Sequence, residues 1–416
     1  MKWKRETGDG RPERIGHYLL ALQICLAMSA CSQSNVKVGA DVLIEKQLDL
    51  VRGKRVGLIT NQTGRLSSGE FLVDVLRSKG VEVVALFGPE HGIRGEAAAG
   101  QSIESGKDVA TGIPVFSLYG KTKKPTPEML QNVDLLIYDI QDVGARFYTY
   151  ISTMKLAMEA AAEARISFIV LDRPNPLGGE MVAGPLMEDS LRSFVGLLPI
   201  PVVYGLTCGE LAMMINAEHW LTGEATVQLA VVTMEGWNRW MRWEDTGLPW
   251  IPPSPNIPLS ATTIAYPATC FIEATNVSEG RGTGTPFQVI GAPFVDSERF
   301  VSSISRVKLR GVNFHSVTFT PKSSKFSGEE CRGVRLEVTD QKRFQPILTG
   351  LNLIQQLRIL YPKEFILNRQ TFSRLMGAAD VYDRLSDGES PESIVSSWQS
   401  SLEKFRVLSS SYYLYY

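Results

Sequence analysis

VDLLIYDI, residues 133–140, is an almost unbroken run of apolar side chains, and three similar runs occur elsewhere in the first half of the chain. Strands of this composition are typical of a parallel sheet that is covered on both faces. Segments with helical character separate the runs, as right-handed crossovers between parallel strands require. The other runs are RVGLIT (55–60), VEVVALFG (81–88) and ISFIVLD (166–172). The sequence therefore predicts an α/β fold built on a parallel sheet.

The pattern changes after Trp243. LPWIPPSPNIP (248–258) contains five prolines, which exclude a regular helix and predict an extended connector. We therefore expect an α/β domain over 37–258 and a smaller α+β domain over 259–416, with the active site in the cleft between them. The remaining expected elements are helices at 69–79, near Pro127, and at 148–164, 209–220 and 347–361, and strands at 227–232, 270–276, 312–321 and 333–340.

The first 31 residues have the features of a lipoprotein signal peptide. Basic residues precede an apolar stretch at 18–30, which is shorter than the roughly 20 apolar residues of a membrane-spanning helix. Small residues then lead to Cys31, as in a lipobox, where this cysteine is acylated and anchors the protein to a membrane. We expect an exported cell-envelope lipoprotein, and Ser32 indicates the periplasmic face of the outer membrane. A plain secretory signal is the alternative.

Composition excludes several classes of function. The formal net charge is −1 and no basic run occurs in the body of the chain, so no nucleic-acid partner is expected. The four histidines are widely spaced and no C-x-x-C occurs, so neither a metal nor another cofactor is expected. Cys208, Cys270 and Cys331 allow at most one disulfide in the body, and whether Cys270 and Cys331 pair stays open.

Polar side chains follow each of the four apolar runs. Because the carboxyl ends of parallel strands meet at one edge of a sheet, we expect the four loops to converge there. The ordinary polarity of loops is the alternative explanation. The loops are TNQTG (60–64), GPEHG (88–92), DIQDVGAR (139–146) and DRPNP (172–176), and their candidate binding residues are Asn61, His91, Gly92, Asp142, Arg146, Arg173 and Asn175.

Glu90 is the candidate general acid. It follows an apolar strand on a turn shaped by glycine and proline, and a desolvated carboxyl group tends to stay protonated. A structural pair with His91 is the alternative. Enzymes that cleave sugar linkages usually need a second carboxylate, for which Glu279, in the glycine-rich segment NVSEGRGTGT (276–285), and Asp142 are the main candidates.

Arginines and aromatic residues could complete such a site. A guanidinium group pairs with a carboxylate in bidentate geometry, so the arginines could bind an anionic substrate group, although structural salt bridges would explain each of them equally well. The aromatic residues could stack on a sugar ring or pack in the core. The residues in question are Arg146, Arg173, Arg281, Tyr119, Phe147 and Tyr148.

Several long motifs in this order resemble the exo-β-N-acetylmuramidase family, glycoside hydrolase family 171, which is NamZ-like and was formerly a domain of unknown function. The resemblance implies a Rossmann-like domain, a smaller C-terminal domain and a cleft between them. The motifs, which run from about residue 56 to 287, are VGLITNQTG, LFGPEHGIRGE, DIQDVGARFYTYISTM, LDRPNPLGG, PSPNIP and TNVSEGRGTGTPF.

The resemblance also implies an activity. Members release the non-reducing terminal N-acetylmuramic acid of peptidoglycan fragments by hydrolysing a β-1,4 bond, in cell-wall turnover and recycling. The motifs place the catalytic residues at Glu90 and Glu279, and add Asn276 and Arg281 to the candidate substrate-binding residues. A non-catalytic muropeptide-binding lipoprotein is the main alternative. A third hypothesis, a nucleotide-dependent enzyme, is supported only by analogy with the Rossmann-like fold.

Overall fold

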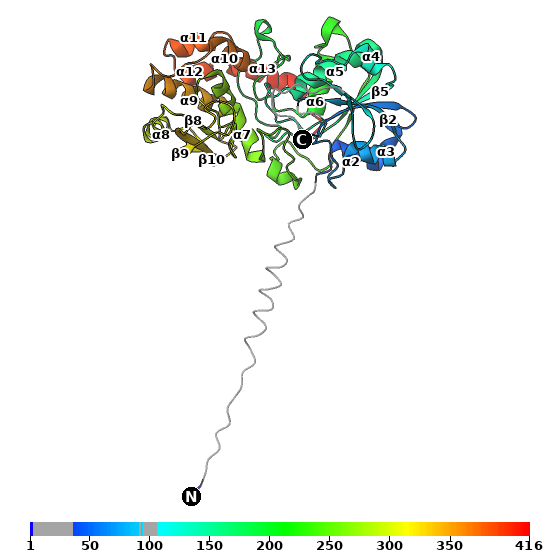
Figure 1. Cartoon of the computed structure of the whole chain (residues 1–416), viewed down its shortest axis with the longest axis horizontal. Helices are drawn as coiled ribbons and strands as arrows, with labels where there is room; N and C mark the ends of the chain where they lie inside the picture. Colours follow the sequence, from blue (N-terminus) through cyan, green and yellow to red (C-terminus); the bar gives the residue numbers. More distant parts are fainter. Residues whose placement is uncertain (3–35, 91–92, 95–105) are drawn as a thin grey trace. The chain divides into compact units, whose positions relative to one another are not determined.

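The computed structural model describes residues 1–2, 36–90, 93–94 and 106–416. Residues 3–31 of the predicted signal peptide, which include Cys31, lie outside the described residues, as do His91 and Gly92. Every helix and strand described below belongs to the compact unit Asn35–Tyr416 (Figure 1). In the described part of the chain, no helix is long and apolar enough to cross a membrane.

The larger sheet has seven strands in the order β3-β4-β2-β1-β5-β6-β7. All neighbouring pairs are parallel except β3 and β4. The five strands that the sequence predicts in this domain are confirmed, whereas the short β3 and β4 are not apparent from sequence. The strands are β1 (Arg55–Thr60), β2 (Glu82–Gly88), β3 (Gly106–Lys107), β4 (Pro114–Ser117), β5 (Leu135–Asp139), β6 (Ser167–Leu171) and β7 (Leu229–Val232).

Helices cover both faces of this sheet, which explains its apolar strands. Leu135 and Ile137 of β5 pack in the same core cluster as α2 and α3, whereas Leu136 and Tyr138 pack in the cluster that contains α4, α5 and α6. Figure 1 shows the sheet between these two layers. The helices are α2 (Gly39–Lys46), α3 (Leu72–Ser78), α4 (Pro127–Leu130), α5 (Tyr150–Ala164) and α6 (Cys208–Ala217), with short 3₁₀ turns η1 (Leu48–Leu50), η2 (Asp189–Leu191), η3 (Thr222–Glu224) and η4 (Trp243–Thr246).

A three-stranded antiparallel sheet, in the order β8-β10-β9, forms the centre of the C-terminal part. Helix α8 packs against β9 and β10 of this sheet, and helix α9 packs against α8. The expected smaller α+β part is therefore present. Its elements are α7 (Ser260–Thr269), η5 (Cys270–Ala274), β8 (Val289–Ala292), α8 (Ser297–Ser305), β9 (Val312–Phe319), β10 (Cys331–Val338), α9 (Pro346–Leu360), α10 (Arg369–Met376), α11 (Val381–Ser386), α12 (Pro391–Ser396) and α13 (Gln399–Ser410).

One expected element of this part is wrong. The segment CFIEATN (270–276) reads as a strand, but its first five residues form the 3₁₀ turn η5, which continues helix α7. All of η5 except Glu273 is buried. A short segment buried on nearly all sides lacks the periodicity that distinguishes a strand from a helical turn.

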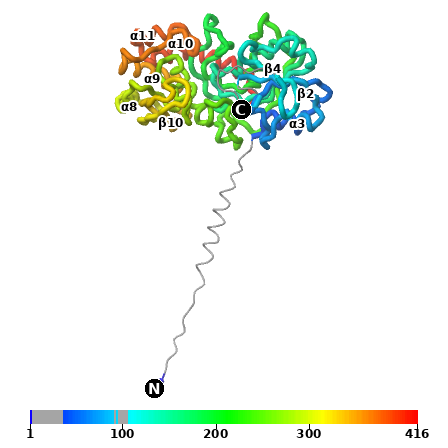
Figure 2. The backbone as a smooth tube through the Cα atoms, viewed as in Figure 1, coloured from blue at the N-terminus to red at the C-terminus, as the bar shows by residue number. Residues whose placement is uncertain are grey.

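The C-terminal tail returns to the larger sheet (Figure 2). The Tyr415 hydroxyl donates a hydrogen bond to Asp172 Oδ2 over 2.7 Å, and its ring packs edge to face against Trp237 with 5.1 Å between centroids. The Leu414 amide donates to Glu210 Oε1 over 3.0 Å. The last residues of the chain therefore help to fix the loop that follows β6.

Candidate active site

The loops after β1, β5 and β6 meet at one edge of the larger sheet. Thr60 at the end of β1 lies beside Asp139 at the end of β5. Gln141 then joins both neighbouring loops: its amide donates to Thr63 Oγ1 over 2.9 Å, and its side chain donates to the Pro174 carbonyl over 2.8 Å. The predicted convergence is confirmed. Because β1 has β2 on one side and β5 on the other, this edge is the topological switch point, where ligands bind in open α/β sheets.

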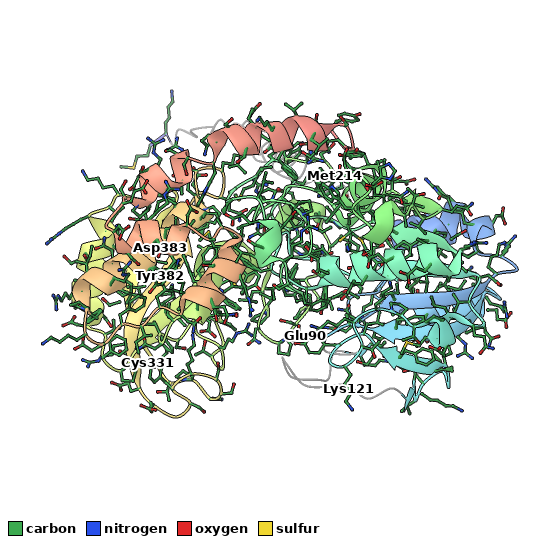
Figure 3. All side chains as sticks on the ribbon, turned by 90° about the horizontal axis from the view of Figure 1, so that it is seen from above. Glu90, Lys121, Met214, Cys331, Tyr382 and Asp383 are labelled. Atoms are coloured by element: carbon green, nitrogen blue, oxygen red, sulfur yellow. The ribbon has the colours of Figure 1, made fainter. Side chains whose placement is uncertain are left out.

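Glu90 lies at the same edge, two residues after β2 ends. Its side chain is partly exposed, and Oε2 accepts a hydrogen bond from the Thr149 hydroxyl over 3.4 Å. Thr149 is the N-cap residue of α5, so the crossover after β5 brings this hydroxyl to the loop after β2. Figure 3 shows Glu90 on the side of the sheet domain that faces the C-terminal elements.

The proline-rich connector is fastened to this edge. The Tyr150 hydroxyl donates to the Pro253 carbonyl over 2.6 Å. The Gln62 side chain donates to the carbonyls of Pro252 and Pro253 over 2.9 and 3.1 Å. These bonds hold the connector against the loop after β1 and the start of α5. The connector predicted from five prolines therefore forms a wall of the site.

A cavity of about 210 Å³ lies beside Glu90. Its walls come from the edge of the larger sheet, from the connector and from the C-terminal part of the chain, so its position matches the expected cleft. Glu90 and Glu273 are the carboxylates among its lining residues, and Arg281 is the cation. The other residues that line it are Tyr119, Phe147, Tyr148, Thr149, Val195, Ser254, Asn256, Ile257, Tyr266, Cys270, Phe287 and Leu375.

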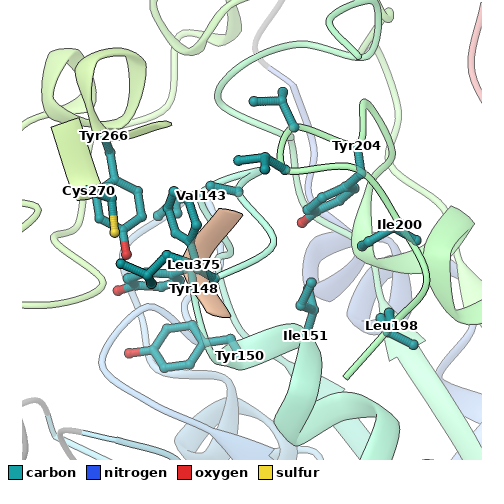
Figure 4. Close-up of a cluster of buried hydrophobic side chains, with 14 of the residues drawn as sticks. Val143, Tyr148, Tyr150, Ile151, Leu198, Ile200, Tyr204, Tyr266, Cys270 and Leu375 are labelled. Atoms are coloured by element: carbon teal, nitrogen blue, oxygen red, sulfur yellow. The ribbon is translucent and has the colours of Figure 1, made fainter. Parts of the chain in front are cut away.

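Aromatic rings make up much of the wall. Phe147 packs edge to face on Tyr266 with 5.0 Å between centroids, and Tyr148 packs likewise on Tyr150 at 4.8 Å. Figure 4 shows Tyr148 and Tyr266 close together, with Cys270 and Leu375 beside them. The two explanations offered by the sequence are therefore compatible, because these rings pack in the core and also line the cavity.

The electrostatic surroundings of Glu90 affect a neighbouring phenol. Burial, followed by the negative charge of Glu90 and a hydrogen bond to it, raises the pKa of Tyr119 to about 12. Tyr119 therefore remains a neutral hydroxyl group over the physiological range. A neutral phenol beside a carboxylate can donate a hydrogen bond to it, which orients the carboxylate within the cavity.

Glu279, the second predicted catalytic residue, is almost completely buried, with 2% of its side chain exposed. It does not line the cavity. Oε1 pairs with Arg281 Nε at 3.2 Å and Oε2 with Lys325 Nζ at 3.1 Å. Both oxygens are therefore engaged in ion pairs, and the geometry gives Glu279 a supporting position behind Arg281.

Arg146 and Arg173 do not line the cavity either. Arg146 is fully buried, and its two terminal nitrogens donate to four backbone carbonyls, those of Pro185, Ile200, Leu375 and Met376. Arg173 pairs with Asp139 through Nε at 2.7 Å. The guanidinium groups of both arginines have partners inside the protein, so the geometry does not bring them to the cavity, and their role in substrate binding stays a prediction.

The remaining predicted binding residues also have internal partners. Asp142 accepts hydrogen bonds from the Gly144 amide and the Tyr204 hydroxyl at 2.7 and 2.5 Å, and burial raises its pKa to about 6. Asn61 and Asn175 accept hydrogen bonds from backbone amides of their own loops, and Asn175 also donates to the Leu206 carbonyl. Asn276 bonds to the backbone of Glu364 and Ile366, which are distant in sequence. Among the predicted site residues that the structure describes, those that line the cavity are Glu90, Arg281 and the aromatic residues Tyr119, Phe147 and Tyr148.

Sequence reasoning missed several residues of the cavity wall. Ser254 and Asn256 belong to PSPNIP, which was recognised as a motif, but no role was assigned to either residue. Glu273 was hidden in the segment expected to be a strand. The signal that could have revealed it is the single charge in an otherwise apolar stretch, CFIEA.

Other features of the described residues do not compete with this cavity. No group of three or more His, Cys, Asp or Glu side chains in that part of the chain is arranged to hold a metal ion. A larger groove of about 590 Å³ runs beside the start of α9, but Glu180 is its one acidic lining residue. Two carboxylates therefore meet at the smaller cavity and not at the larger groove.

Comparison with known proteins decides the family. A model of the N-terminal domain of the exo-β-N-acetylmuramidase NamZ matches residues 56–261, and the model of its C-terminal domain matches residues 264–415. The chain belongs to the NamZ family. The peptidoglycan β-N-acetylmuramidase NamZ of Bacillus subtilis is 48% identical over 382 residues, which cover 91% of each chain.

Two solved structures from Bacteroides fragilis share the NamZ-family fold of this chain. Both are crystal structures of DUF1343 family proteins. One has a TM-score of 0.85 and 41% identity, and covers 92% of this chain and 100% of its own. The other has a TM-score of 0.76 and 33% identity, and covers 92% and 99%. The similarity in fold therefore extends over both the larger sheet and the C-terminal part.

Proposed function

We propose that this protein is an exo-acting glycoside hydrolase that releases the non-reducing terminal N-acetylmuramic acid of peptidoglycan fragments by cleaving a β-1,4 bond. The observation that carries the proposal is the position of Glu90, partly exposed in the wall of a cavity at the switch point of the sheet. Membership of the NamZ family and the name of the Bacillus subtilis relative support the same substrate.

The site supports a simple division of tasks. Glu90 would donate a proton to the glycosidic oxygen as its bond to the anomeric carbon breaks, and the oxocarbenium-like centre would face the opposite wall. Arg281 is the cation among the described residues that line the cavity, and the lactyl carboxylate of N-acetylmuramic acid is a suitable partner for a guanidinium group. The small size of the cavity supports binding of one terminal sugar and not of an internal segment of a glycan strand.

The activity is tested with the purified body of the chain, residues 32–416. Wild type should release N-acetylmuramic acid from a muramic-acid-terminated disaccharide, and chromophore from a chromogenic β-N-acetylmuramide. The matched β-N-acetylglucosaminide lacks the lactyl group and should react much more slowly. Binding of the muramide without turnover would contradict the proposal and favour a muropeptide-binding protein.

We further propose that the full chain is a lipoprotein anchored through Cys31 at the periplasmic face of the outer membrane, where it acts in peptidoglycan recycling. The basic start, the short apolar stretch and the small residues before Cys31 support this location. Wild type expressed in a Gram-negative host should partition into the detergent phase of a Triton X-114 extract and Cys31→Ser into the aqueous phase. Equal partitioning of the two would contradict the anchor.

A further inference from the structure

Two carboxylates face the cavity from opposite parts of the chain. Glu90 comes from the loop after β2, whereas Glu273 comes from η5, at the start of the C-terminal part. They are the acidic residues among the described residues that line the cavity. A glycosidase needs one carboxyl group on each side of the sugar linkage, and walls contributed by two separate elements can supply such an arrangement.

Glu273 and Glu279 differ in accessibility. The Glu273 side chain retains 29% exposure, whereas Glu279 retains 2%. Glu273 Oε1 pairs with Arg281 Nη2 at 2.5 Å, but Glu279 has both oxygens in ion pairs. Glu273 can therefore reach a substrate in the cavity, while Glu279 would have to break two ion pairs to do so.

The surroundings of Glu273 hold it in place. Lys325 Nζ donates to the carbonyls of Ile272, Glu273 and Val277 over 3.0, 3.2 and 3.0 Å, and pairs with Glu279. Arg281 lies between the two glutamates and contacts both. Lys325 thus fixes the backbone that carries Glu273, and Arg281 fixes its carboxylate. Together they preorganise the side chain, as a catalytic group requires.

Burial raises the pKa of Glu273, although the positive charge of Arg281 opposes this effect. A carboxylate with a raised pKa is a stronger proton acceptor once it is ionised, which suits a group that activates water. Arg281 stays charged because the negative charge of Glu273 raises its pKa, despite burial, which acts in the opposite direction. The pair can therefore remain ionised in a partly buried wall.

We propose that Glu273 is the second catalytic carboxylate and that Arg281 is its positioning residue. The inference rests on the proposed function. Glu90 gives its proton to the glycosidic oxygen as the bond to C1 breaks and the bonding electron pair passes to that oxygen. Glu273 supplies the electron pair for the new bond on the opposite face of C1, either from its own oxygen or from a water whose proton it takes.

Chemical rescue separates this role from a structural one. Glu273→Ala should lower kcat on the chromogenic muramide by about 10²–10⁴-fold, and added azide should restore turnover because the small anion fills the space left by the carboxylate. Attack from the face opposite the leaving group gives the α-glycosyl azide, which NMR distinguishes from the β-anomer. Glu273→Gln, which keeps the shape of the side chain, should lose as much activity and should not respond to azide.

Three comparison variants make the result interpretable. Glu279→Ala should lower the Tm, and azide should neither raise its activity nor give a glycosyl azide. Arg281→Lys keeps the positive charge but loses the planar guanidinium group that contacts both glutamates. Its kcat should therefore fall less than that of Glu273→Ala, and azide should not restore it. Glu403→Gln alters a carboxylate with 70% exposure on α13, and its kcat and Tm should match those of wild type.

The outcomes distinguish this inference from the proposed function. Loss of turnover in Glu273→Ala with recovery as the α-azide supports Glu273. Near-wild-type turnover by Glu273→Gln, formation of the β-azide, or rescue of Glu279→Ala in place of Glu273→Ala would overturn the assignment while leaving the proposed function intact. An inactive wild type would instead contradict the proposed function.

Discussion

Replacing Arg146 with methionine tests how the structure uses this buried arginine. The side chain is fully buried, and its nitrogens donate to four backbone carbonyls at distances of 2.6–3.1 Å. Two of the acceptors, Leu375 and Met376, end helix α10, while Pro185 and Ile200 lie in the loops after β6. The guanidinium group therefore joins the two parts of the compact unit.

The magnitude follows from the four bonds. Methionine fills a similar volume but leaves four buried carbonyls without this donor, and each lost bond costs about 1 kcal/mol or more. Removing a buried cation also removes the cost of its desolvation, which offsets part of this loss. We therefore expect Arg146→Met to lower the free energy of unfolding by about 4 kcal/mol. For a chain of this size, that corresponds to a Tm lowered by roughly 5 °C.

Urea denaturation of residues 32–416, followed by circular dichroism, measures the change. Arg374→Met removes an exposed arginine from the same helix α10 and should change the stability by no more than about 0.5 kcal/mol. At a temperature where all variants are folded, Arg146→Met should keep the wild-type KM. A stability within about 1 kcal/mol of wild type, or a large rise in KM alone, would refute the structural role and restore Arg146 as a substrate ligand.

Two further substitutions probe particular contacts. Burial raises the pKa of Asp142 from 3.8 to about 6, so the folded state binds this proton more tightly than the unfolded state does. The resulting contribution to stability, about 3 kcal/mol, is present below pH 4 and is lost as the pH rises through 6. Asp142→Asn should flatten this decline in urea denaturation at pH 4 to 7, and an unchanged slope would contradict the assignment. Gly333→Ala places a Cβ 1.9 Å from the Ile290 carbonyl oxygen, which should break the pairing of β10 with β8 and lower the unfolding free energy by about 2–3 kcal/mol. Gly106→Ala, with no atom within 4 Å, is the control; equal stability of the two variants would show that β8 and β10 can separate at no cost.

Much of the fold could be predicted because the local sequence of the central strands is enough to identify them. Residues 55–60 and 133–140 are apolar on both sides, which requires helices on both faces of a sheet, and the structure has them. Elements without such a signal were missed. β4 contains four residues that start with a proline, and η5 is buried on nearly all sides, so its periodicity could not separate a strand from a helical turn.

The candidate site could be predicted only in part for a related reason. The sequence shows which residues follow a strand. Because Glu90 follows β2, its position at the edge of the sheet could be predicted correctly. The sequence does not show which side chains turn inward, so Arg146 and Arg173 were expected in the site although their partners are backbone carbonyls and Asp139. The exposure that distinguishes Glu273 from Glu279 depends on the tertiary positions of Arg281 and Lys325, which pair with Glu279 in space although they lie two and 46 positions beyond it in the sequence.

The role of Glu90 is tested most directly by comparing wild type with Glu90→Gln on two substrates that differ in the leaving group. Loss of a general acid should lower kcat by about 10²–10⁴-fold on the natural disaccharide, whose leaving oxygen needs a proton, with little change in KM. A chromogenic muramide with an acidic phenol as leaving group should be affected much less. Equal rates for wild type and Glu90→Gln on the disaccharide would contradict the central claim.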